Sequence, residues 1–257
     1  MSESVSKIAP TVSKSSVLFV IFMCAERLKE NYLNFETRSF KWRETQLHAI
    51  VEAMDKMRKE FSEALFKDLG KAPEANLTEI GLVTGCAQHA IKHLREYMTD
   101  IHEETELLLA PGRTYIRYEP LGVVGIYSAW NYPVLLCAHP LIDAIAAGNC
   151  CILKPSELAP NVSACFAKMV TQYLDTNHIV CIEGGIDVAV ELNKQPLDFI
   201  CFTGSTYVGK IIAETAAKNL TPCLLELGGK CPLVVHPTCD MLHTTEKIAF
   251  SKFGNSG

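Results

Sequence analysis

Several patterns that commonly identify a metal site are missing from this sequence. Its eleven cysteines include no C-x-x-C pair, and Cys150 and Cys151 stand together in an apolar run. His89 and His93 have helical spacing, but no H-E-x-x-H motif contains them. Buried thiols behave as small hydrophobic groups, so we predict structural cysteines, no metal ligands and a reducing environment.

A surplus of positive charge and a long hydrophobic run are also missing. The 257 residues carry 24 Lys and Arg against 29 Asp and Glu, a net charge of −5, which argues against nucleic acid as a partner. The most apolar stretch, residues 17–25, is much shorter than the roughly 20 residues of a membrane span. It resembles a weak signal-peptide core, but no small-residue cleavage site follows it. We predict a partly disordered leader over residues 1–25 and a partly buried first helix.

The sequence does contain a regular alternation of helical and strand patterns. Two helical stretches, at about 24–69 and 74–98, precede an exposed strand at 114–119. Short apolar runs then alternate with helices, which predicts an α/β fold with a Rossmann-like parallel sheet and helices on both faces. The expected strands are 121–128, 150–153, 178–182, 199–203, 223–227 and 232–235, and the expected helices are 133–147, 161–174, 188–192 and 208–218.

The common dinucleotide motif G-x-G-x-x-G is absent, and residues 204–209 are the nearest substitute. They follow a predicted strand and begin a helix, so backbone N–H groups there can face a pyrophosphate. Gly204, Ser205, Thr206 and Gly209 are therefore candidate cofactor-binding residues. Taken alone, such a turn is more often simple helix capping by Ser205 or Thr206.

A second candidate cofactor element is the run Lys-Pro-Ser-Glu at residues 154–157, just after a predicted strand. A lysine donor and a carboxylate acceptor suit the two hydroxyls of a ribose. Glu157 on the 2′-hydroxyl favours NAD, because a 2′-phosphate would be repelled, although NADP stays open. The alternative is an exposed ion pair between Lys154 and Glu157 in a loop.

Two further motifs suggest catalytic groups. Trp130 and Asn131 follow the first strand of the sheet, where a side-chain amide can stabilise an oxyanion, although an asparagine before a proline is usually a helix cap. Glu226 stands between leucines ahead of two glycines. We predict that it is buried, with a raised pKa suited to a general base, and the alternative is a carboxylate bonded to turn amides.

In their order along the chain, these motifs resemble those of aldehyde dehydrogenases. Residues 251–257, Ser-Lys-Phe-Gly-Asn-Ser-Gly, resemble the stretch that leads into that family's catalytic cysteine, and residues 37–47 and 220–222 resemble the class 3 branch for fatty or aromatic aldehydes. The resemblance implies an N-terminal part of such an enzyme that ends just before its nucleophile. Residues 26–230 would form the NAD(P)-binding domain and 231–257 the start of a catalytic domain.

The resemblance also assigns roles. Asn131 would supply half of an oxyanion hole, and Glu226 would activate the cysteine or the hydrolytic water. Lys154, Glu157, Gly204, Ser205, Thr206, Gly209 and Trp130 would form the cofactor site. An aldehyde would be oxidised to an acid through a cysteine thioester.

Residues 99–119 would be an arm that pairs subunits into a homodimer. The expected location is cytoplasmic, with membrane association through a C-terminal tail left open. The chain alone is expected to be inactive, because none of its cysteines matches the family nucleophile. The alternatives are a non-catalytic NAD-binding or dimer-forming module that ends at Gly257, and an acyl-phosphate reductase, which fits the Glu226 motif poorly.

Overall fold

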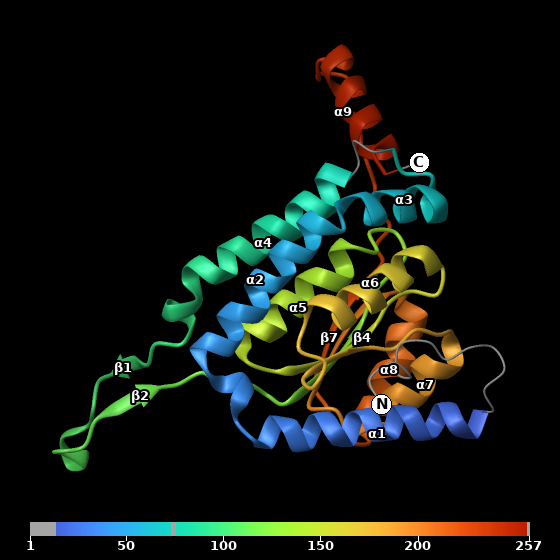
Figure 1. Ribbon diagram of the computed structural model, residues 1–257. Helices are drawn as coiled ribbons and strands as arrows, with labels where there is room; N and C mark the ends of the chain where they lie inside the picture. Colours follow the sequence, from blue (N-terminus) through green and yellow to red (C-terminus); the bar gives the residue numbers. More distant parts are fainter. Residues whose placement is uncertain (1–13, 73–75, 256–257) are drawn as a thin grey trace.

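The computed structural model describes residues 14–72 and 76–255, and its centre is a five-stranded parallel sheet (Figure 1). The strand order is β5-β4-β3-β6-β7. This confirms the predicted parallel sheet and five of its six expected strands. Their bounds are β3 (Val123–Tyr127), β4 (Cys150–Lys154), β5 (Ile179–Cys181), β6 (Phe199–Gly204) and β7 (Cys223–Leu227).

The sixth expected strand, at residues 232–235, is wrong. These residues form no strand, and Val234 is 92% exposed. An apolar run forms a strand only where a neighbouring edge accepts its hydrogen bonds. Within the described part of the chain, β6 is the only strand paired with β7, and nothing pairs beyond β7.

Helices cover both faces of the sheet. The first face carries α5 (Leu135–Ala147) and α6 (Pro160–Tyr173), over which α2 (Phe40–Lys56), α3 (Arg58–Leu69) and α4 (Asn76–Tyr97) form an outer layer. The second face carries α1 (Lys14–Leu33), α7 (Ile186–Asn193) and α8 (Thr206–Ala217). Because both faces are covered, the central strands are mostly apolar, and their side chains, which alternate between the faces, supply two separate cores.

The N-terminal predictions need correction. The expected helix 24–69 is three helices. The chain turns at Phe35 (φ 64°) and forms a 3₁₀ turn, η1 (Glu36–Arg38), before Ser39 caps α2, and a second break at Met57 separates α2 from α3. The partly buried first helix expected here is present as α1, which begins at Lys14, within the stretch predicted as a partly disordered leader, and buries Ile21 in the second core. Residues 1–13 lie outside the described part. No helix within the described residues has the length and apolarity needed to cross a bilayer.

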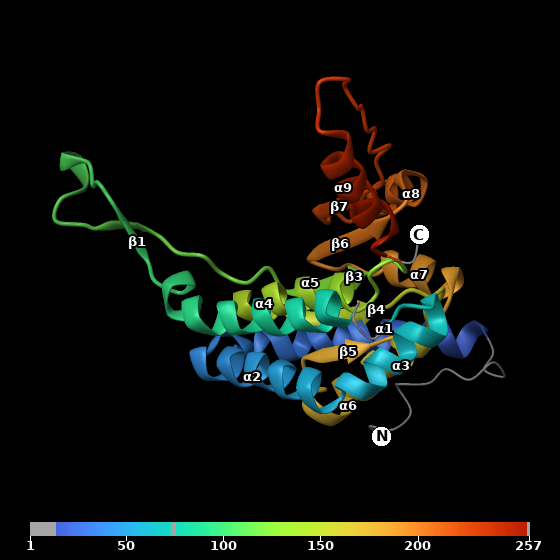
Figure 2. The ribbon, with the colours of Figure 1, turned by 90° about the horizontal axis from the view of Figure 1, so that it is seen from above.

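Two parts of the chain project from this body (Figures 1 and 2). One is a hairpin of β1 (Ile101–Glu103) and β2 (Thr114–Ile116) joined through the 3₁₀ turn η3 (Leu107–Leu109), with every strand residue exposed. The other is α9 (Met241–Phe253), which has no buried residue. The exposed strand expected at 114–119 is present over residues 114–116.

Candidate active site

The motif residues of four strands meet at the carboxyl edge of the sheet. In the ladder, Tyr127 pairs with Lys154 on one side and with Phe202 on the other, and Thr203 pairs with Glu226. The chain runs from β3 outward through β4 to β5 and then returns to the other side of β3 with β6. The connections therefore leave β3 and β6 in opposite directions, which makes the crevice beyond their ends a topological switch point.

Asn131 lies in the loop that leaves this crevice from β3. Its side chain is exposed, and its amide NH₂ donates to no acceptor among the described residues. Its carbonyl oxygen accepts from Lys71 Nζ at 2.7 Å and from Asn255 Nδ2 at 3.0 Å. The end of α9, 124 residues further along the chain, is thus held against the β3–α5 loop. Trp130, the residue before Asn131, is 51% exposed.

Lys154 and Glu157 form a close ion pair at the end of β4. Lys154 Nζ lies 2.7 Å from Glu157 Oε2 and also donates to the carbonyl of Pro155. The lysine is buried, whereas the glutamate is partly open to solvent. Burial acts to raise the pKa of Glu157, but the Lys154 hydrogen bond, a backbone hydrogen bond and the lysine charge together lower it. The pair therefore presents a held ammonium and an ionised carboxylate at the crevice.

The residues of the turn at 204–209 have two different roles, helix capping and close packing. Ser205 caps α8, since its hydroxyl accepts from the N–H of Val208 at 3.2 Å. By helix geometry the first-turn N–H groups of Thr206 and Tyr207 lack acceptors within the helix and point toward the edge of the sheet. Gly209 has a different role, because a β-carbon there would lie 2.7 Å from Leu227 Cδ2. Its lack of a side chain lets α8 pack closely on β7.

The predicted burial of Glu226 is wrong in this structure. The residue is exposed, and β7 is the edge strand of the sheet. The α5 helix covers β3 and β4 on that face, while Leu224 and Glu226 project from β7 where no described element lies over them. Burial, and after it the charges of Asp143 and Glu226, raise the pKa of Cys201 to about 11, so the Glu226 carboxylate lies within electrostatic reach of β6.

One pair of functional candidates was not identified from the sequence. Lys71 and Glu79 are 2% and 1% exposed, form an ion pair, and contact the loop that carries Asn131. Their sequence signal is weak. Lys71 follows a helix-ending glycine, Gly70 (φ 65°), and Glu79 occupies an apolar position of α4 beside Ile80.

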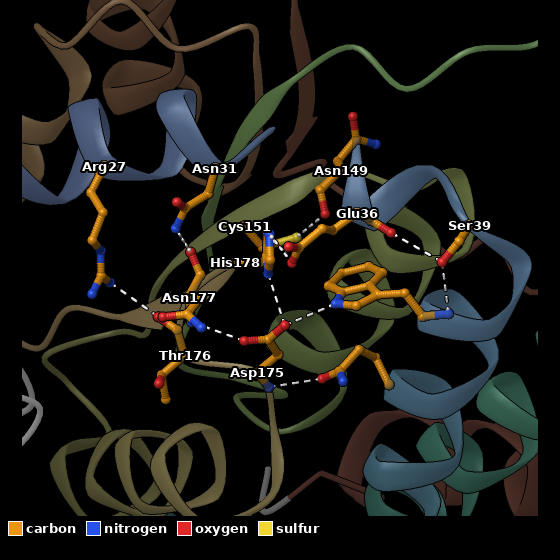
Figure 3. A network of polar contacts seen from close by, with 12 residues as sticks. Arg27, Asn31, Glu36, Ser39, Asn149, Cys151, Asp175, Thr176, Asn177 and His178 are labelled. Atoms are coloured by element: carbon orange, nitrogen blue, oxygen red, sulfur yellow. Dashed lines mark hydrogen bonds and ion pairs between the residues drawn. The ribbon is translucent and has the colours of Figure 1, made fainter. Parts of the chain in front are cut away.

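A different polar network lies at the opposite, amino edge of the sheet (Figure 3). The Asp175 carboxylate accepts from Trp42 Nε1 at 2.9 Å and from the backbone N–H of Asn177, and it lies 2.8 Å from His178 Nδ1. The His178 hydrogen bond, partly offset by burial and helped by that of Trp42, lowers the pKa of Asp175 to about 2. This network ties the α6–β5 loop to α2. Among the described residues, no three His, Cys, Asp or Glu side chains gather as metal ligands.

Comparison with known proteins connects this geometry to a family. A model described as the aldehyde dehydrogenase family matches residues 22–257. An aldehyde dehydrogenase of Craterostigma plantagineum is 44% identical over 232 residues, covering 90% of this chain and 48% of that protein. Aldehyde dehydrogenase family 3 member A2 of Macaca fascicularis is 40% identical over 233 residues, covering 90% of this chain and 48% of that protein.

Solved structures agree in fold. The substrate-bound state of Staphylococcus aureus AldH superposes with a TM-score of 0.89 at 39% identity, covering 91% of this chain and 52% of that one. A lactaldehyde dehydrogenase superposes with a TM-score of 0.82 at 27% identity, covering 95% and 51%. The chain spans about half the length of the curated relatives it matches.

Proposed function

Because the chain belongs to the aldehyde dehydrogenase family, we propose that it takes part in oxidising an aldehyde to a carboxylic acid with a nicotinamide dinucleotide. Family 3 members among its relatives confirm the resemblance to the class 3 branch. One observation carries the proposal. The Asn131 amide, the Lys154–Glu157 pair, the start of α8 and Glu226 all lie at the carboxyl edge of one parallel sheet, around its switch point.

The residues at this edge fit a dinucleotide. Lys154 and Glu157 offer a donor and an acceptor to a ribose diol, and the N-terminus of α8 offers backbone N–H groups and the positive end of a helix dipole to a pyrophosphate. The ionised Glu157 disfavours a 2′-phosphate, so we propose NAD as the better ligand and NADP as the weaker one. When bound, the nicotinamide supplies a hydride acceptor.

Two other side chains are assigned to the chemistry. Asn131 Nδ2 is free to donate to the oxygen of an aldehyde as negative charge develops there. Glu226, one strand spacing from Thr203, is the general base for the water that releases the acid. An exposed carboxylate is a weak base, so this role requires a cover over β7 that would exclude water from Glu226.

The cofactor part of the proposal is tested by NAD binding to the chain, measured by calorimetry. Glu157→Gln removes a charged acceptor, and the expected result is NAD binding weakened by about tenfold with a smaller loss for NADP. Glu191→Gln is the matched control, because Glu191 forms an i,i+3 pair with Lys194 at 2.6 Å on α7. Equal NAD affinity in the Glu157 variant and the parent chain would remove this assignment.

The competing function is a non-catalytic NAD-binding or dimer-forming module. It shares the cofactor site, so turnover separates the two. Burial raises the pKa of nine of the eleven thiols, which makes them poor nucleophiles. The other two, Cys231 and Cys239, do not match the family nucleophile, so we expect the 257-residue chain alone to bind NAD without producing NADH from a long-chain aldehyde. Sustained NADH formation would show that one of these cysteines is active.

A further inference from the structure

We propose that Lys71 and Glu79 form a buried clamp that positions Asn131, so that both are positioning residues for the oxyanion donor. The proposal rests on the function assigned to Asn131 above. Lys71 belongs to the connection between α3 and α4, Glu79 belongs to α4, and both side chains are buried.

Lys71 holds the loop before Pro133. Its ammonium donates to the Asn131 carbonyl oxygen at 2.7 Å and lies 4.4 Å from the centre of the Tyr132 ring. Both contacts are made by a side chain that is only 2% exposed. The peptide that follows the Asn131 α-carbon is therefore fixed in position and orientation, and this limits the directions in which the Asn131 amide can point.

Glu79 holds the same loop after Pro133. Its Oε2 accepts from the backbone N–H of Val134 at 2.9 Å and from that of Leu135 at 3.2 Å, which are the first amides of α5. No side chain next to the start of α5 supplies this cap, so a carboxylate from α4 replaces it. The negative charge also suits the positive end of the α5 dipole.

The pairing of Lys71 with Glu79 joins these two contacts into one device. A buried ion pair adds little stability over apolar residues of the same volume, because both charges lose their hydration. Here each partner also bonds to the loop backbone on a different side of Pro133, which has no N–H of its own. We therefore attribute the ion pair to the positioning of residues 131–135 and not to stability.

The clamp also acts on the end of α9. Asn255 Nδ2 donates to the same Asn131 carbonyl at 3.0 Å, so Lys71 and Asn255 share one acceptor. A shift of that carbonyl would move the oxyanion donor and the segment after α9 together. Lys71, through the Asn131 carbonyl, therefore helps to fix both of them.

The test uses backbone and asparagine side-chain NMR on the 257-residue chain. In Glu79→Ala, hydrogen exchange of the Val134 and Leu135 amides should accelerate by at least tenfold. In Lys71→Met, the Asn131 side-chain NH₂ signals, assigned by their loss in Asn131→Asp, should shift and broaden. Lys71→Arg keeps a charged donor and should restore a single sharp pair of signals.

Two further variants separate positioning from folding. The double variant with Lys71→Met and Glu79→Met replaces the pair with apolar groups, so a folded chain with a displaced Asn131 signal is expected. Asp68→Asn is the matched control, since Asp68 caps α6 in the same way through the N–H of Val162 at 2.9 Å. It should accelerate exchange at Val162 and leave Val134, Leu135 and the Asn131 signals unchanged.

The outcomes are distinguishable. Unchanged Asn131 signals in both the Lys71 variant and the double variant would overturn the clamp, whatever the function of the chain. NAD binding is measured separately, on the parent chain, because the clamp does not include Lys154, Glu157 or the start of α8. A parent chain that fails to bind NAD would refute the proposed cofactor site and leave the clamp measurements valid.

Discussion

At the scale of single residues, Asp175 has the clearest link between geometry and stability. Its carboxylate receives hydrogen bonds from Trp42 and from the backbone of Asn177 and lies beside His178. These contacts favour the ionised form, so the pKa of Asp175 falls from its ordinary value of 3.8 to about 2. A lowered folded-state pKa stabilises the fold above pH 4, and this contribution is lost as the pH falls from about 4 to about 2.

We therefore expect Asp175→Asn to cost about 1–2 kcal/mol of unfolding free energy at pH 7, with the difference from the parent chain shrinking below pH 4. Urea unfolding from pH 2 to pH 7 measures both quantities. Asp55→Asn is the control, because Asp55 is exposed and forms a long ion pair of 3.9 Å with Arg58. A constant difference between the Asp175 variant and the parent chain across this range would contradict the assignment.

Residue-level prediction from the sequence succeeded where the next residues along the chain decide the outcome. Ser205 was a candidate cofactor-binding residue, with helix capping as the alternative role, and in the structure its hydroxyl caps α8. Prediction from the sequence failed where contacts with distant segments determine the environment of a residue. The exposure of Glu226 depends on which helix covers β7, and Lys71 and Glu79 meet the Asn131 loop 55 to 60 residues away. A local pattern of residue types predicts neither the exposure of Glu226 nor the contact of Lys71 and Glu79 with this loop.

At the scale of elements, the two helices that lie on the first face of the sheet, α5 and α6, are capped in the same way. α5 and α6 both lack a local side-chain cap, and the outer helical layer supplies a carboxylate to each of them. Glu79 of α4 caps α5, and Asp68 of α3 caps α6 through Asn161 and Val162. Periodicity predicted these helices to within about two residues, but their caps could be found only from the packing of the layers.

Removing the cap on α6 should therefore destabilise the whole domain. Asp68→Ala is expected to lower the free energy of unfolding by about 1 kcal/mol, because the first amides of α6 lose their acceptor. Chemical denaturation measures this change. Glu63→Ala is the control, since Glu63 lies on the same helix and only forms a long surface ion pair with Lys59. Equal effects of the two substitutions would show that Asp68 contributes nothing as a cap.

At the scale of the whole molecule, the hairpin of β1 and β2 is the part that a single chain does not explain. It extends away from the body, and Leu107, Leu108 and Leu109 at its tip are exposed (Figure 1). Exposed apolar residues on a projecting arm suit contact with another subunit. This agrees with the dimer arm expected at residues 99–119, which we retain as a proposal.

Replacing the three leucines with serine should leave the unfolding free energy nearly unchanged, since they belong to neither core. If the arm pairs subunits, the dissociation constant of the dimer should rise at least tenfold. Sedimentation equilibrium measures the constant, and a Leu158→Ser variant, with an exposed leucine on the body, controls for general surface polarity. A parent chain that sediments as a monomer, or an unaffected dimer, would exclude the arm.

The strand order has a consequence for how the polypeptide is made. β3 is the first strand of the sheet to be synthesised and becomes its centre, with β4 and β5 adding to one side. The other edge of β3 pairs with β6, which is synthesised later. While the 71 residues from 128 to 198 emerge from the ribosome, the backbone N–H and C=O groups along that edge of β3 have no strand partner. During translation that open flank of β3 is a site where unwanted strand pairing can occur, and pairing with β6 closes it.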